Sequence, residues 1–275
     1  MKLPKLWSES IADLERFANA LNRVSQTADL ASGLLGSLGS IRSQASELRT
    51  EEKTRRKYRA IRFPELVIVP PIERQLHPAR TKLEGAFLQL VYECYEKVEV
   101  VSRLGVEHLD RIRRADFQVC VRGTVTFGSA SVAVEDHWRV DTHYFQEEST
   151  EPHPWFHYQR GGHAQDRFAE TTGFLPGDCL EAAKFQEGIN LCALMQTAPP
   201  RVPMPPMDPI CAINFVIAQH DGITWKKLWS IPEYDGVVRK AQEKLWKPYF
   251  DMVAQGEHRK RLMPFFGAPS PTTFA

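Results

Sequence analysis

Histidine and carboxylate side chains that could carry out acid–base chemistry are concentrated in the middle of the chain. Five of the nine histidines fall within 27 residues, at His137, His143, His153, His157 and His163. On one predicted strand, every second position is occupied by one of these side chains, so they share a face: Glu135, His137, Arg139, Asp141 and His143. A carboxylate beside an imidazole orients the ring and stabilises its charged form, so His143 with Asp141, or His137 with Glu135, could transfer protons. A hydrolase or transferase centre is therefore one hypothesis for this segment.

Cys120 is a second candidate for the centre of such an enzyme. The alternation of its strand puts it on the polar side, together with Arg122 and Arg139. Neighbouring cations favour the thiolate, which is the reactive form of cysteine. The same polar side of the sheet could thus hold either a His/Asp centre or a cysteine centre.

Signatures of a metal or cofactor site are missing from this segment. Imidazole and carboxylate groups bind divalent metals, but no HExxH, HxH or HxxxH pair falls within one predicted element. Arg139, between His137 and His143, would repel a cation. The chain also contains no GxSxG elbow, P-loop or GxGxxG motif. We predict no metal and no cofactor, and whether the protein is an enzyme stays open.

Two strands joined as a hairpin must position these side chains. Every second residue of 132–144 is mostly apolar, and residues 117–127 alternate in the same way, so each strand has one apolar and one polar face. Residues 128–131 predict a four-residue hairpin loop. The implied cross-strand partners are Phe127 with Val132, Arg122 with His137, and Thr124 with Glu135. A slip of one residue would mix the two faces and is disfavoured.

A third strand, predicted over 154–160, extends the polar face. Its alternation puts His157 and Gln159 on one side and Phe156 and Tyr158 on the other. The predicted binding face consists of Arg122, Glu135, His137, Arg139, Asp141, His143, His157 and Gln159. Clustered polar, aromatic and arginine side chains of this kind are typical of surfaces that bind proteins.

The first part of the chain, residues 1–62, predicts a helical arm. Apolar residues recur every three or four positions, and glycines at Gly33, Gly36 and Gly39 each cost about 1 kcal/mol in a helix. We expect two helices, 10–32 and 40–58, broken near these glycines. The apolar stripe of residues 10–58 would pack on the body, on a second copy or on a partner protein. The basic segment 53–62 could instead contact the phosphates of a nucleic acid.

The rest of the chain predicts an α+β domain over 63–256, followed by a loosely ordered tail, 257–275. Apolar spacing in 81–104 predicts a helix, and the prolines of 198–208 predict an extended crossing. Asp208 and Pro209 then have the types expected at a helix start, before further helices at 209–220, 224–229 and from Pro232. The predicted fold is an antiparallel meander sheet of three to five strands covered by helices.

This order of a helix, an antiparallel meander, a proline-rich crossing and further helices, over 81–220, resembles that of ubiquitin-conjugating-like domains. In that family the catalytic cysteine lies between the last strand and the following helix. The matching segment here, TAPPRVPMPPMDP, contains no cysteine. The resemblance therefore implies an inactive relative, or one with a displaced cysteine.

Composition limits where and how the protein acts. The formal charge of +1 creates no overall field that would attract nucleic acid or an anionic membrane. Five widely spaced cysteines without a Cys-x-x-Cys pair, and no apolar run of about 18 residues, predict a soluble cytoplasmic protein that does not enter a membrane. We expect an accessory or interaction protein that binds protein partners or itself through the helical arm and the polar sheet face.

Overall fold

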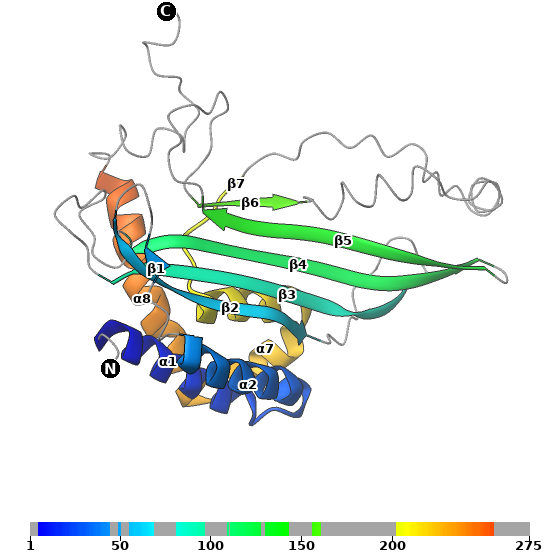
Figure 1. Cartoon of the computed structure of the whole chain (residues 1–275). Helices are drawn as coiled ribbons and strands as arrows, with labels where there is room; N and C mark the ends of the chain where they lie inside the picture. The colour runs from blue at the N-terminus through cyan, green and yellow to red at the C-terminus, as the bar shows by residue number, and fades with distance from the viewer. Residues whose placement is uncertain are drawn as a thin grey trace, which may run out of the picture.

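The protein folds as an α+β structure in which all the helices described lie on one side of a large sheet (Figure 1). The computed structural model describes residues 5–44, 49–50, 55–68, 81–96, 109, 111–127, 130–142, 156–160 and 202–255. The α+β class is therefore confirmed. The tail 257–275 and the segment 161–200 lie outside the described residues.

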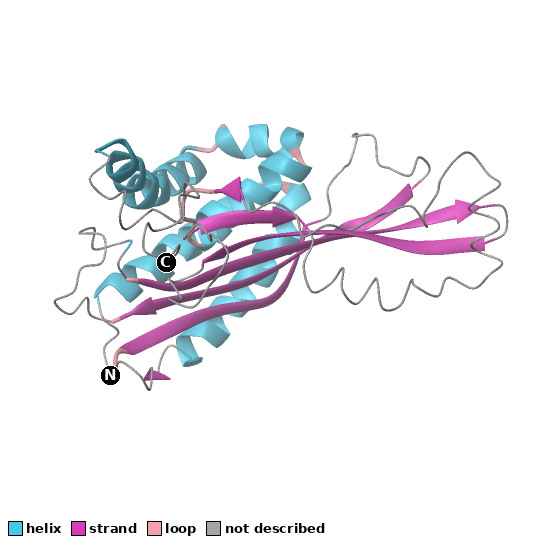
Figure 2. Cartoon of the chain, turned by 90° about the horizontal axis from the view of Figure 1, so that it is seen from above, coloured by secondary structure: helices cyan, strands magenta, loops and turns pink. Residues whose placement is uncertain are grey.

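Among the described residues the sheet has seven strands, each antiparallel to its neighbours and placed in sequence order. The strands are β1 (Arg49–Thr50), β2 (Lys57–Ile68), β3 (Thr81–Tyr95), β4 (Ile112–Phe127), β5 (Ala130–Thr142), β6 (Phe156–Arg160) and β7 (Val202–Pro203). The prediction of three to five strands was too low. Seen from above, the long central strands run on at one end beyond the helices (Figure 2).

The helices cover the apolar side of this sheet. They are α1 (Lys5–Leu21), the 3-10 turn η1 (Ser25–Thr27), α2 (Ala28–Gln44), α6 (Pro209–His220), α7 (Gly222–Trp229) and α8 (Pro232–Gln255). None of the helices among the described residues is both long and apolar enough to cross a membrane. The core forms between these helices and buried strand residues such as Leu90, Phe117 and Val140.

The break between the first two helices lies earlier than predicted. The chain turns between Leu21 and Ala28, where the Thr27 hydroxyl donates to the carbonyl of Leu21 at 2.6 Å, and Gly33 to Gly39 lie inside α2. The reason is burial: Leu34 is fully buried against the sheet, which outweighs the low helix propensity of three glycines. The apolar stripe of α1 and α2 is thus buried in the chain's own core.

The helix predicted over 40–58 is wrong at Arg49–Thr50 and from Lys57 onward. The chain instead enters β1 and then β2, so Lys57 to Arg62 lie on a strand. This placement divides the basic segment between two faces. Arg59 lies on the helix side and is 1% exposed, whereas Arg62 lies on the opposite side of the sheet.

The helix predicted over 81–104 is also wrong, because residues 81–95 form the central strand β3. Ala86, Leu88, Leu90 and Tyr92 are all buried on one side, which is the two-residue period of a strand. Apolar residues such as Val91 on the other side conceal that period in the sequence. This correction removes the first helix from the element order on which the resemblance to ubiquitin-conjugating-like domains depends.

The β4–β5 hairpin has the predicted faces but a register shifted by two residues. Phe127 pairs with Ala130 and Arg122 with Glu135, so only residues 128 and 129 connect the strands. A shift of two leaves every side chain on its own face, so alternation alone could not distinguish a two-residue from a four-residue connection. The third strand is confirmed as β6, with the predicted alternation.

The start of α6 agrees with its sequence signals. Asp208 is the N-cap, and its carboxylate accepts a hydrogen bond from the backbone N–H of Cys211 at 2.8 Å. Pro209 occupies the first turn, where its missing N–H has no helical partner to lose. The helix is buried as predicted, with Ile210, Ile213 and Ile217 nearly inaccessible.

Candidate binding face on the sheet

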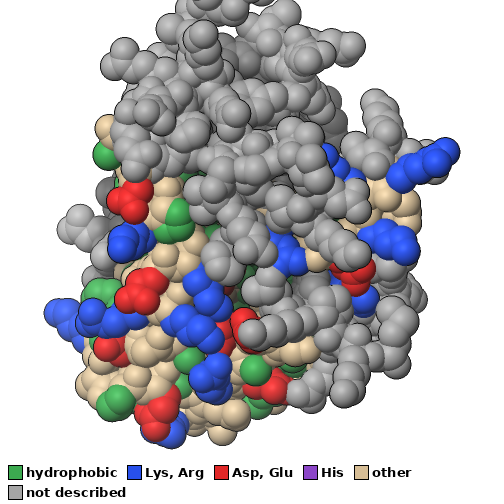
Figure 3. Space-filling view, turned by 90° about the vertical axis from the view of Figure 1, so that its left-hand side faces the viewer, with side chains coloured by type: hydrophobic (Ala, Val, Ile, Leu, Met, Phe, Trp, Pro, Cys, Tyr) green, Lys and Arg blue, Asp and Glu red, His purple; other side chains and the backbone are tan. Residues whose placement is uncertain are grey.

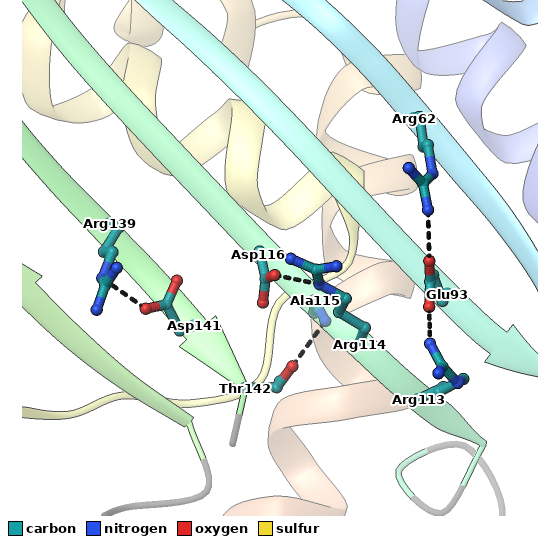
Figure 4. Close-up of polar contacts among 9 residues, drawn as sticks. All are labelled: Arg62, Glu93, Arg113, Arg114, Ala115, Asp116, Arg139, Asp141 and Thr142. Carbon is teal, nitrogen blue, oxygen red and sulfur yellow. Dashed lines mark hydrogen bonds and ion pairs between the residues drawn. The ribbon is translucent and has the colours of Figure 1, made fainter. Parts of the chain in front are cut away.

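The side of the sheet that faces away from the helices carries most of the predicted site residues. Figure 4 views the sheet from this side, with Arg139 and Asp141 in front of the strands and the helices behind. We call this side the polar face and define it by Tyr58, Arg62, Glu65, Phe87, Gln89, Glu93, Arg113, Arg114, Asp116, Gln118, Cys120, Arg122, His137, Arg139, Asp141, His157 and Gln159. It combines strands β2 to β6.

Glu93 is the centre of one ionic group on the polar face. Its side chain is only 2% exposed and lies between two arginines, with Arg62 Nη2 3.0 Å from Oε1 and Arg113 bonded to Oε2 (Figure 4). The guanidinium of Arg113 also stacks over the ring of Tyr58 at 4.0 Å. A buried carboxylate paired on both sides holds the two arginines in fixed positions.

Two further arginines are held in the same manner along β4. Arg114 pairs with Asp116, and Arg122 lies 3.4 Å from Glu65 while its guanidinium stands 4.5 Å from the centre of the Phe87 ring. The side chains of Arg114 and Arg122 are 49% and 42% exposed. They are therefore both ordered and accessible.

The third ionic group joins β5 to β6. Arg139 Nε lies 2.6 Å from Asp141 Oδ2, and its Nη2 donates to Gln159 Oε1 at 2.9 Å. Asp141 and Gln159 are 6% and 8% exposed, so this group is more enclosed than the arginines on β4. The sequence alternation had placed these three residues on one face, and the structure brings them into contact.

The histidines on the polar face occupy two separate positions. His157 is fully buried and lies directly opposite Asp141, while His137 is 4% exposed and lies opposite Cys120. Asp141 is four residues along β5 from His137, which is about 13 Å at about 3.3 Å per residue. His137 and His157 therefore do not converge on one point, and the predicted cross-strand partner of His137, Arg122, was wrong.

Two of the predicted site residues cannot be placed in this network. His143 lies outside the described residues, and of Glu135 only the backbone is described, paired with Arg122. The predicted pairs of His143 with Asp141 and of His137 with Glu135 thus stay predictions. Within the described ranges, no group of three or more histidine, cysteine or acidic side chains is arranged to hold a metal ion.

Sequence reasoning missed the ionic group around Glu93. Arg62, Glu93 and Arg113 were not assigned to the predicted binding face, because residues 81–104 were interpreted as a helix and the basic segment 53–62 as a helix end. The alternation of Leu88, Leu90 and Tyr92 was the available signal for β3. It would have placed Glu93 on the polar side.

The polar face is thus an array of arginine–carboxylate pairs with stacked rings, next to two enclosed histidines. Searches against protein-family models, curated proteins and solved structures found no match to this chain.

Proposed function

We propose that the protein is an accessory protein that binds another protein through the polar face. The observation that supports this most directly is the row of half-exposed arginines on β2 and β4: Arg62, Arg114 and Arg122 have 46%, 49% and 42% of their side chains exposed. Each is held by a carboxylate of the same chain. An arginine that is already ordered loses less conformational entropy when a partner binds.

The residue types and the charge of this face favour a protein partner over a nucleic acid. Arginine and tyrosine are enriched where proteins bind one another, and Tyr58 and Phe87 lie beneath guanidinium groups here. Every arginine of the polar face has an acidic partner, and because Arg62 and Arg113 share Glu93, five arginines face four carboxylates and the excess of positive charge is only one. Lys57 to Arg62, the part of the basic segment 53–62 that lies on β2, point alternately to the two sides of the sheet, which also favours a protein partner.

Crosslinking from the polar face tests this proposal. A photo-crosslinking residue in place of Gln89, which is exposed on this face, is expected to give one discrete heavier product in cells that naturally produce the protein. Arg62→Ala combined with Arg114→Ala should reduce its yield at least about tenfold, since arginines at interface centres often contribute 2 kcal/mol or more. Mass spectrometry of the product identifies either another protein or a second copy.

Matched variants on the helix side serve as controls. A photo-crosslinking residue in place of Lys247, which is exposed on α8, should give no such product. The variant Arg239→Ala should leave the yield of the product from Gln89 unchanged. Equal products from Gln89 and Lys247, or a yield that does not respond to the double variant, would contradict binding through the polar face.

A cysteine-centred hydrolase or transferase is the second candidate function. The observation that favours it is the direct cross-strand position of Cys120 and His137, with Cys120 partly exposed. An imidazole next to a thiol can accept its proton and leave the nucleophilic thiolate. In this proposal His137 is the base and Cys120 the nucleophile.

Alkylation by iodoacetamide at pH 7, resolved by mass spectrometry, tests the second candidate. We expect Cys120 to react at least about tenfold faster than Cys94 and Cys211, because burial raises the pKa of Cys94 to about 12 and that of Cys211 well above its usual range. His137→Phe should slow Cys120 to the rate of an ordinary thiol with a pKa of about 8.5. An unchanged rate in His137→Phe would rule out His137 as the base.

A further inference from the structure

A cavity of about 90 Å³ lies on the helix side of the sheet, away from the polar face. Ile61 and Tyr92 contribute from β2 and β3, Leu14 from α1, Ile210 from α6 and Leu245 from α8. Each of these residues is at most 9% exposed. Three helices and the sheet therefore contribute buried apolar side chains to the cavity wall.

Asp13, which lines the cavity, is surrounded by an excess of positive charge. Asp13 is approached by three cations, with Arg16 at 2.5 Å, Lys240 at 2.9 Å and Lys244 at 3.4 Å. One carboxylate cannot neutralise three cations. Figure 3 views the end of the molecule at which α1 begins, where lysine and arginine side chains are interspersed with acidic ones.

Lys244 and Arg111 bring this charge to the cavity lining. The acidic side chains of the lining are Asp13, which pairs with Lys244, and Asp208. Burial raises the pKa of the Asp208 carboxyl above its usual range, and one of its oxygens caps α6. Burial likewise raises the pKa of Cys94 to about 12, so this lining thiol stays neutral.

We propose that this cavity binds a small organic anion, with its carboxylate near Lys244 and Arg111 and its apolar body against Leu14, Ile210 and Leu245. The volume of the cavity limits the size of the ligand. A water-sized unit requires about 10–15 Å³ of such volume, so the cavity accommodates about six to nine of them, and hence a ligand with about as many non-hydrogen atoms. The site is independent of protein binding at the polar face.

Benzoate has the proposed charge and size, and benzyl alcohol is its neutral counterpart. In isothermal titration calorimetry of the whole chain, benzoate is expected to bind saturably at one site, and benzyl alcohol at least about tenfold more weakly. Lys244→Met removes the charge but keeps most of the side-chain length, and should weaken benzoate about tenfold. Lys247→Met, on the same helix but exposed, should leave benzoate binding unchanged.

A steric variant locates the site. Ala241 lines the cavity and is 4% exposed, so Ala241→Leu would fill part of it and is expected to abolish benzoate binding. Thermal unfolding checks that each variant is folded. If Ala241→Leu does not fold, Lys244→Met and Lys247→Met decide the question alone. No saturable benzoate binding, equal binding of benzyl alcohol, or equal effects of the two lysine variants would overturn the proposal.

Discussion

Phe17→Ala is expected to destabilise the whole protein by about 3–5 kcal/mol, the range for removing a large aromatic side chain from a core. Phe17 is fully buried in α1 and stacks on Tyr234 of α8, with ring centres 5.3 Å apart. Its loss would leave a cavity between the first and last helices. Urea denaturation followed by tryptophan fluorescence measures the change in the free energy of unfolding.

The control is Phe250→Ala, the same substitution on α8 at a side chain that is 52% exposed, and it should change the free energy by no more than about 0.5 kcal/mol. A single shifted transition in Phe17→Ala would show that α1 and the body unfold together. If Phe17→Ala instead shifted only a minor unfolding transition at low urea concentration, the first helices would be a separately folding arm. That result would contradict their place in the common core.

Glu96→Ala is expected to destabilise the protein by about 3–5 kcal/mol, because it leaves a buried cation without its partner. The Arg59 side chain is 1% exposed, and both its Nε and Nη2 donate to Glu96 Oε1, at 2.9 and 2.6 Å. Among the described residues no hydrogen-bond partner reaches the buried Nη1 of Arg59. Arg59 therefore already carries one costly unpaired donor.

Replacing both partners separates the buried charge from the packing. Arg59→Met with Glu96→Ala should recover most of the stability lost in Glu96→Ala, since an apolar side chain of similar length needs no counter-charge. Glu233→Ala removes a comparable bidentate pair with Arg23 at the surface and should leave the denaturation midpoint nearly unchanged. A double variant as unstable as Glu96→Ala would show that Arg59 contributes mainly through packing.

Local sequence signals were sufficient where one segment decides its own structure. Asp208 followed by Pro209 predicted the start of α6, because the cap and the missing proline N–H act within one turn. Alternation in 117–127, 132–144 and 154–160 predicted β4, β5 and β6 and the polar side of Arg139, Asp141 and Gln159. These features need only the neighbouring residues to be known.

Segments whose structure depends on distant partners were predicted less well. Glycines at Gly33, Gly36 and Gly39 disfavour a helix locally, yet Leu34 in α2 is buried against the sheet. In β3 both faces carry apolar side chains, so the helical and strand periods could not be separated by pattern. Because a helix was predicted over 81–104, Glu93 and the two arginines that pair with it were not assigned to the polar face.

The sequence by itself determined the class of the fold, the two chemical faces of the central strands and the buried helix α6, because these depend on side-chain periodicity and on caps within a few residues. Tertiary structure alone decided which side chains meet. The two-residue connection set the register that pairs His137 with Cys120, and β3 brought Glu93 between Arg62 and Arg113. Distances between side chains on neighbouring strands depend on strand order and register. The two-residue alternation of apolar and polar side chains is the same in two registers that differ by two residues, so it cannot distinguish them.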